Sequence, residues 1–265
     1  MSVIESLPRL RAPRPDRLIP WIVPLVIVLL WQAACLSGLV PARVLPAPSD
    51  VAIAGWKLVK SGELARNIWV SFWRAGIGFL IGGSIGFGLG LANGLSELSS
   101  KLTDTTLQMV RNIPHLAMIP LVILWFGIGE EAKLFLITIG VFFPIYINTV
   151  HGIRSIDLRL LEMGRSYGLS RLGLFLNVIL PGALPSILVG LRYALGIMWL
   201  TLIVAETIAC DNGIGYMTMN ARDFLQTDIV LLGICLYALL GKAADMVTRL
   251  LERRLLRWHP AHSAS

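Results

Sequence analysis

The chain has 265 residues, of which 55% are hydrophobic and 15% are charged, and its mean hydropathy is +0.73. A soluble domain of this length with so few charges would be hard to keep in solution, so the composition predicts a polytopic membrane protein. The net charge of +7 does not indicate a nucleic-acid partner, because the Lys and Arg residues lie between hydrophobic runs and not on one solvated face. The three Cys residues lack metal-ligand spacing, and no metal site is expected.

The first hydrophobic run follows a short basic segment. Residues 1–17 contain four Arg among several Pro, and residues 18–36 carry no charge. At 1.5 Å per residue, the uncharged run is long enough to cross a hydrocarbon layer of about 30 Å. No convincing small-residue cleavage site follows it, so we predict a retained first helix and not a signal peptide. A candidate interfacial helix over residues 50–60 is then expected on the outer surface.

A second span is predicted over residues 68–95, and a ladder of glycines runs along it. The glycines recur every four residues, at Gly78, Gly82, Gly86, Gly90 and Gly94. Because residues four apart share one helix face, the ladder predicts close packing against another helix. The same run matches the G-x-S-x-G hydrolase pattern around Ser84, but that pattern needs a strand-to-helix elbow, which is not expected here.

Four more spans follow, which gives six in all. A polar turn at residues 97–111 precedes a third span that reaches about Gly129, and Pro114 and Pro120 break or kink its start. His115 lies between these prolines without a second His or Cys at metal spacing. The remaining spans are predicted over residues 134–150, 187–205 and, with its flanks, 229–241.

The Lys and Arg residues are unevenly divided between the two sides of the predicted membrane. If both termini are inside, the inner segments hold 15 of them, in residues 1–17, 95–111, 151–184 and 241–265. The outer segments hold six, in residues 40–69, 127–133 and 206–228. Because cytoplasmic loops carry the excess of positive charge, both termini and the polar segment around residue 165 are predicted in the cytoplasm.

That polar segment is the longest polar interruption between two hydrophobic runs. Polar side chains recur at helical spacing at Glu162, Arg165 and Ser166. Gly168 permits a turn, and Ser170 is a candidate N-cap for a second short helix. Two short helices joined by a bend would form a knob that can pass movement from a soluble partner to a membrane channel.

An intramolecular role for this segment is the alternative. Glu162 would then pair with Arg165 or Arg159 on a solvated helix face, a contact worth a few tenths of a kcal/mol. Such a pair does not account for the pattern that continues as far as Pro181, so we favour the coupling role.

The segment resembles the cytoplasmic signature loop of bacterial ABC importer permeases. That loop has a Glu-Ala-Ala opening, a Gly six residues after the Glu, and a hydrophobic-x-Leu-Pro close. The matching positions are Glu162, Met163, Gly164, Gly168, Val178, Leu180 and Pro181, with Met163 and Gly164 in place of the two Ala. Further segments resemble the aliphatic sulfonate branch of the nitrate, taurine and sulfonate permeases, at residues 111–133, 143–157, 179–207 and 220–228.

The resemblance, which extends over residues 21–260, implies an all-α fold of the type I importer class. The transmembrane domain would occupy residues 67–251, after a cytoplasmic tail at 1–17 and a first helix with an outer segment at 18–66, and before a tail at 252–265. We call residues 157–182 the coupling segment. The residues expected to contact or move with an ATPase are Glu162, Gly164, Tyr167, Gly168, Leu169, Leu180 and Pro181.

The resemblance also implies partners. They are a second copy of the permease, two ATP-binding-cassette subunits that bind ATP and Mg, and a solute-binding protein outside the bacterial inner membrane. The chain itself contains no G-x-x-x-x-G-K-[ST] phosphate loop, so we expect a transport subunit that binds no cofactor and is not an enzyme.

The substrate path is expected to use few polar groups. A sulfonate is always negatively charged, and a weak site suited to passage needs hydroxyls, amides and one cation. The candidates are Asn148, Arg192, Trp199 and Thr201. Arg192 has a second interpretation as a snorkelling or helix-packing residue. Taurine, nitrate or another small anion remains an alternative substrate, because in this family the binding protein supplies most of the selectivity.

Two other classes of function have less support in the sequence. A secondary transporter would show repeated halves with interrupted helices in corresponding places, which the chain lacks. An intramembrane hydrolase would require Ser84 and His115 to meet at hydrogen-bond distance.

Overall fold

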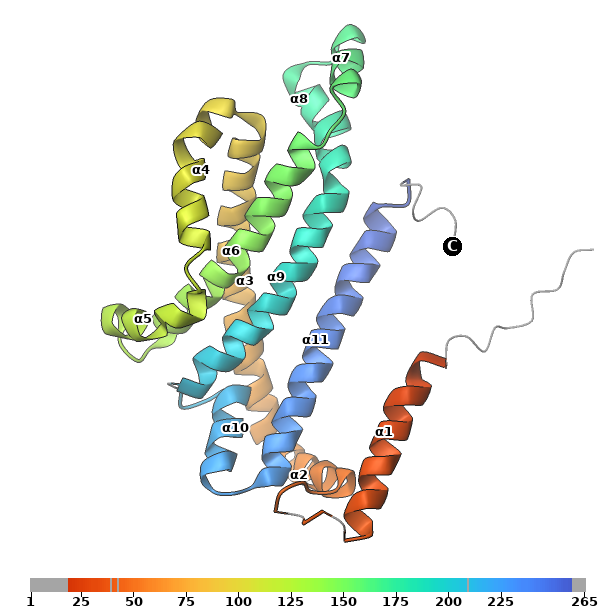
Figure 1. Cartoon of the computed structure of the whole chain (residues 1–265), viewed down its shortest axis with the longest axis vertical. Coiled ribbons are helices and arrows are strands. Elements are labelled where there is room, and N and C mark those ends of the chain that lie inside the picture. Colours follow the sequence, from red (N-terminus) through yellow and green to blue (C-terminus); the bar gives the residue numbers. More distant parts are fainter. Residues whose placement is uncertain (1–18, 39, 42, 209, 259–265) are drawn as a thin grey trace, which may run out of the picture.

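The computed structural model describes residues 19–258, apart from residues 39, 42 and 209. Every regular element in these residues is a helix, and none is a strand (Figure 1). The prediction of an all-α membrane protein is therefore confirmed. The predicted N-terminal tail at 1–17 lies outside the described residues, and the tail at 252–265 is described only as far as residue 258.

Four helical segments are long and apolar enough to cross a bilayer. They are α3 (Glu63–Leu95), α6 (Glu130–Arg154), the continuous segment Arg171–Ile208 and α11 (Thr227–Leu255). A fifth candidate is a broken pair, in which α4 (Glu97–Arg111) and the helices from His115 to Phe126 meet at a bend of 77°. The apolar helix α1 (Ile19–Leu36) is shorter. The predicted number of six spans is reached only if the broken pair and α1 each cross the membrane, so it remains a prediction.

The broken pair differs from the sequence prediction. Residues 97–111 were expected as a polar turn, but they form the 15-residue helix α4. Ser96 caps it by accepting a hydrogen bond from the Ser99 N–H at 3.3 Å. The charged residues of this stretch mark one face of a helix and not a loop. The 3-10 helix η2 (His115–Met118) and α5 (Ile119–Phe126) follow the bend.

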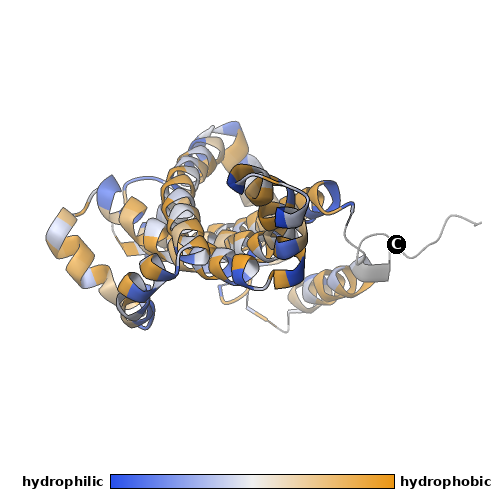
Figure 2. Ribbon diagram, turned by 90° about the horizontal axis from the view of Figure 1, so that it is seen from above, coloured by the Kyte–Doolittle hydropathy of each residue, from blue (hydrophilic) through white to orange (hydrophobic). Residues whose placement is uncertain are grey.

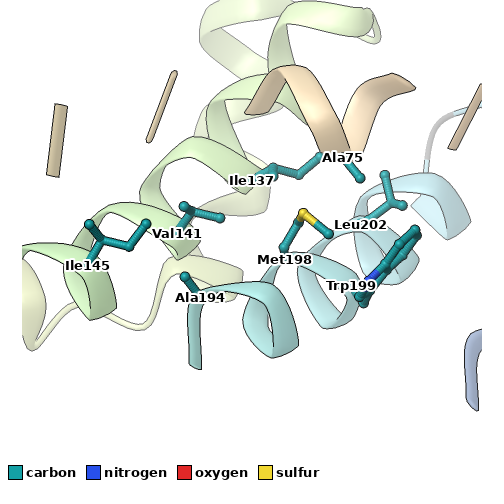
Figure 3. Close-up of a cluster of buried hydrophobic side chains, with 8 residues drawn as sticks. All are labelled: Ala75, Ile137, Val141, Ile145, Ala194, Met198, Trp199 and Leu202. Carbon is teal, nitrogen blue, oxygen red and sulfur yellow. The ribbon is translucent and has the colours of Figure 1, made fainter. Parts of the chain in front are cut away.

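Helices α3, α6 and α9 (Leu180–Ile208) form the centre of the bundle, with α6 between the other two. All five glycines of the ladder face α6, whose residues Ile137, Thr138, Phe142, Thr149 and Ile153 lie against them. Figure 3 shows the adjacent apolar core, with Ile137 and Val141 of α6 facing Met198 and Leu202 of α9. The two outer helices are thus held by one central helix.

Two short helices lie across one end of the bundle, which we call the α10 end (Figure 1). Helix α2 (Pro48–Lys60) includes the predicted interfacial helix and buries Val51 and Ala54, and α10 (Ile214–Asp223) buries Ile214 and Met217. The opposite end, where α3 finishes and α7 (Leu158–Ser166) begins, is called the α7 end. Figure 2, viewed from the α7 end, shows hydrophobic residues also on the outward faces of the helices. Such faces are expected where a protein meets lipid.

The tightness of the α3–α6 contact generates a paired prediction. A methyl group added at Gly86 would lie 2.6 Å from the Phe142 carbonyl oxygen, whereas one added at Gly88 would meet no atom within 4 Å. We expect Gly86→Ala to lower the free energy of unfolding by about 1–3 kcal/mol, because the backbones must separate. Gly88→Ala should be neutral or stabilising by up to about 1 kcal/mol, since Ala favours the helix. Thermal unfolding of both variants in one detergent measures the difference, and equal melting temperatures would contradict it.

Candidate functional site

The coupling segment protrudes at the α7 end of the bundle (Figure 1). Asp157 begins α7 by accepting a hydrogen bond from the Arg159 N–H at 2.9 Å. Gly168 ends it in a left-handed conformation with φ of +77°, and the Leu169 N–H donates to the Gly164 carbonyl at 3.1 Å. Ser170 then caps α8 (Arg171–Leu174) by accepting from the Gly173 N–H at 3.1 Å. The predicted bend at Gly168 and the predicted cap at Ser170 are both present.

Gly164 is the point at which the two arms of the segment touch. It is buried, and a methyl group added there would lie 2.7 Å from Leu174 Cδ1 and 3.3 Å from Leu169 Cδ1. Leu174 is itself only 8% exposed. The site where the signature loop has Ala thus holds a smaller residue, because Leu174 fills the space that a methyl group would need.

The outer surface of the segment is apolar and exposed. Tyr167 is 82% exposed, Leu172 is 66% exposed, and Met163 has about half of its surface exposed. Glu162 is exposed as well, and none of the residues the structure describes forms an ion pair with it. The alternative in which Glu162 pairs with Arg159 or Arg165 therefore has no support in this geometry.

The second arm is not a separate helix, and this differs from the predicted pair of short helices. Helix α8, the π-helix η3 (Phe175–Ile179) and α9 follow one another without a gap, so that one helical segment of 38 residues runs from Arg171 to Ile208. Pro181 has no N–H to donate. This missing donor accounts for the irregular pattern of backbone hydrogen bonds where the wide π turn passes into α9. The span predicted over residues 187–205 is longer, and Leu180 and Pro181 lie within its helix.

Comparison with known proteins identifies the family. Residues 84–257 match the family described as the binding-protein-dependent transport system inner membrane component. The chain belongs to this permease family. Members are subunits of importers and not enzymes, and ATP hydrolysis belongs to separate ATPase subunits. The expected resemblance to ABC importer permeases is therefore confirmed.

Three curated relatives carry more specific names. The permease is 61% identical over 246 residues to SsuC of Escherichia coli (strain K12), named for aliphatic sulfonates transport, with 93% of this chain and 94% of that protein covered. It is 45% identical to SsuC of Bacillus subtilis (strain 168), with coverages of 91% and 87%. Identity to the taurine transport system permease TauC of Escherichia coli (strain K12) is 36%, with coverages of 88% and 87%.

A buried cluster of charges at the α10 end was not predicted. Arg74 is 3% exposed, and its guanidinium donates to the exposed Glu130 at 2.6 Å and to the buried Glu206 Oε1 at 2.9 Å. Glu206 is 1% exposed and also accepts from Ser71 Oγ at 2.8 Å and from the Gly215 N–H at 2.9 Å. The cluster joins α3, α6, α9 and the start of α10. The only signs of this cluster in the sequence were a single Arg within one predicted span and a Glu at the end of another. The order of residues in the chain does not show that the two side chains meet.

Three of the four residues predicted for the substrate path have separate polar partners, and the fourth, Trp199, has a buried indole N–H without one among the described residues. Thr201 is fully buried with its Oγ1 3.0 Å from His115 Nε2, and Trp199 is 7% exposed within the core. The Asn148 amide donates to the Pro144 carbonyl at 2.8 Å. Arg192 donates to Glu252 of α11 at 2.6 Å, which is the helix-packing arrangement. The structure does not gather these four side chains around one cavity, and their role in transport stays a prediction.

The structure gives no support to a hydrolase. Ser84 lies in the middle of α3, so the strand-to-helix elbow of the G-x-S-x-G pattern is missing around it. His115 is engaged with Thr201, and no bond between His115 and Ser84 occurs in the described part of the chain. Within the same residues, no three His, Cys, Asp or Glu side chains could hold a metal ion.

The buried cluster generates a prediction on stability. Glu206→Ala would leave the Arg74 charge buried with a weaker set of partners, and losing one member of a buried pair costs about 3–5 kcal/mol. We expect a lower melting temperature and a lower yield of folded permease in detergent. Glu131→Ala, which removes an exposed carboxylate from the same end, is the matched control and should change neither. Equal melting of the two variants would show that the cluster does not hold the helices together.

Proposed function

We propose that the chain is the permease subunit of an ATP-driven importer of aliphatic sulfonates. Two copies would form the membrane path, two ATP-binding-cassette subunits would bind ATP and Mg, and a solute-binding protein would deliver the substrate from outside. The permease itself would bind no cofactor. It would reside in the bacterial inner membrane with both termini and the α7 end in the cytoplasm, as the excess of Lys and Arg there supports.

The observation that carries the coupling role is the exposed surface of the coupling segment. Tyr167, Leu172 and Met163 expose large apolar side chains on the two sides of a bend, and Glu162 adds an unpaired carboxylate. Large apolar residues exposed in this way, in a segment that follows the end of a membrane helix, are typical of a binding surface for another protein. A groove on an ATPase subunit is the partner that the family supplies.

The continuous helix from Arg171 to Ile208 supports a mechanism. ATP binding would close the two ATPase subunits and bring the two coupling segments together. Because α8 and α9 are parts of one helix, a displacement of the coupling segment would tilt α9 within the membrane. The cluster of Arg74, Glu130 and Glu206 would hold the far end of α9 to α3 and α6, so that the tilt changes access to the cavity between the two copies.

The substrate assignment is supported by the order of sequence identities. Identity is 61% and 45% to two permeases named for aliphatic sulfonates, 36% to one named for taurine and 30% to a nitrate import permease. Taurine is itself a sulfonate, and a transporter of taurine is the second candidate. Nitrate has only its negative charge in common with an aliphatic sulfonate.

The coupling role predicts a loss of transport without a loss of protein. We expect Glu162→Lys to lower ATP-dependent sulfonate uptake at least tenfold in cells that still carry normal amounts of the permease in the membrane, because the reversed charge opposes docking. Gly168→Pro should act in the same direction, since proline cannot adopt the positive φ of +77° found there. Arg254→Glu reverses an exposed charge near the end of α11 and serves as the control. Unchanged uptake in Glu162→Lys would remove the coupling proposal.

The substrate proposal is tested with the purified transporter. Permease, ATPase subunits and binding protein would be reconstituted in vesicles, and uptake of a labelled alkanesulfonate would be measured with and without ATP. We expect ATP-dependent uptake that unlabelled alkanesulfonates compete for strongly, taurine weakly and nitrate hardly at all. Strong competition by nitrate would contradict the substrate, and uptake by the permease alone would contradict the whole assignment.

A further inference from the structure

A cavity of about 290 Å³ lies between α4 and α6, on the side of the bundle away from α9 and α11 (Figure 1). One part of its lining is apolar, with Leu107 from α4 and Phe143, Ile147 and Val150 from α6. The other part is polar and carries Arg111, Arg154, His151, Gln108 and Asp104. A site with both kinds of lining suits a ligand with a charged head and a short hydrocarbon chain.

The polar lining has an excess of positive charge. Arg154 donates to Ser100 Oγ at 2.6 Å and to the Asn93 carbonyl at 3.1 Å, which fixes its position without neutralising it. Gln108 donates to Asp104 at 2.8 Å, which leaves one negative charge in the lining against the two arginines. Arg111 forms no hydrogen bond or ion pair with any residue that the structure describes. The cavity thus offers a guanidinium whose hydrogen-bond donors are all available.

The level of Arg111 along the bundle makes this unusual, since the exposed side chain lies far from both ends. Helix α4 returns from the α7 end, and its 15 residues rise about 21 Å between Glu97 and Arg111. Arg111 lines the same cavity as Phe143, which lies near the middle of α6, so it is far from either end of that helix. In a hydrocarbon layer of about 30 Å, this level is well inside the membrane. A charge there costs about 2.5–3.5 kcal/mol on insertion scales and is expected to face protein, water or a counter-ion.

A purely structural role does not account for these observations. Arg111 stands in the last turn of α4, where a cation stabilises the helix dipole by about 0.3–1 kcal/mol. That gain is smaller than the cost of the charge at this depth. It also leaves unexplained why the cavity places this cation next to an apolar wall.

We propose that the α4–α6 cavity is a transient binding site for the substrate, in which Arg111 binds the sulfonate group and the wall of Leu107, Phe143 and Ile147 binds its alkyl chain. The proposal rests on the function proposed above and adds the residues that recognise the substrate within the permease. One unpaired cation is a weak site, and a weak site releases its anion. Arg154 also lines the next cavity towards the α7 end, so it marks the direction of release.

The first experiment measures uptake in the reconstituted transporter. We expect Arg111→Gln to lower ATP-dependent alkanesulfonate uptake at least tenfold and Arg111→Lys to keep it within about threefold of the unaltered protein. ATP hydrolysis stimulated by the loaded binding protein should persist in both, which a mere folding defect would not allow. Arg253→Gln, which removes an exposed charge at the end of α11, is the control. Uptake by Arg111→Gln within twofold of the unaltered protein would overturn the site and leave the proposed function intact.

The second experiment does not depend on transport. Leu107→Cys would be introduced into a permease whose three native cysteines are replaced by Ala, in vesicles of phosphatidylcholine. A thiosulfonate reagent carrying a sulfonate and one carrying a trimethylammonium group would be compared, each rate being divided by that of free cysteine. We expect the anionic reagent to be favoured at least fivefold, hexanesulfonate to protect, and both effects to vanish when Arg111→Gln is added.

Two outcomes of the labelling would contradict the proposal. If the preference for the anionic reagent is the same with and without Arg111, the arginine does not form an anion site. If phosphatidylglycerol in the vesicles protects the thiol and hexanesulfonate does not, the cavity holds a lipid and not the substrate. An importer that takes up no sulfonate even when unaltered would instead overturn the proposed function, whatever the labelling shows.

Discussion

Backbone atoms of α6 lie directly against the glycine face of α3, and the positions of the other elements depend on this contact. The Phe142 carbonyl oxygen occupies the space where a Cβ at Gly86 would be, and Thr138 does the same at Gly82. Two helices without intervening side chains cannot shift past each other without a clash. Helix α9 packs on the same central helix, through Val141 and Met198 among others. The arrangement gives a rigid frame of three helices within an otherwise extended bundle.

The two ends of this frame are built differently. At the α10 end, Arg74 and Glu206 are buried and joined by hydrogen bonds that also reach Glu130 and the start of α10. At the α7 end, the coupling segment extends beyond the frame and exposes Tyr167 and Leu172. Because α8 and α9 are one continuous helix, the exposed end and the fixed end are connected mechanically. A partner that moves the coupling segment would therefore tilt α9, because the far end of α9 is held by the charge cluster at the α10 end.

Arginines within or beside the membrane-spanning helices have different roles according to their partners. Arg74 is fully paired, and Arg192 pairs with Glu252 and lies near Asp245, so both arginines hold helices together. Arg111 has a cavity in place of a partner among the described residues. Arg74 is buried, and its charge is compensated by opposite charges and hydrogen bonds, whereas Arg111 is exposed at a level well inside the membrane, where an uncompensated charge points to a ligand. The path residues expected from the sequence included Arg192 but not Arg111, because Arg111 ends the stretch 97–111, which the sequence indicated as a polar turn where a charge is ordinary.

The sequence by itself determined the all-helical membrane class, the glycine face of α3, the bend at Gly168 and the cap at Ser170, and it was sufficient to recognise the permease family. These features depend on composition and on spacings of a few residues, which local helix geometry converts directly into structure. Only the tertiary structure decided that residues 97–111 form half of a broken span, that Leu180 and Pro181 lie inside a continuous helix, and that Arg74, Glu130 and Glu206 meet. These features join residues up to 132 positions apart in the chain, and such contacts are set by how helices pack and not by the order of their residues.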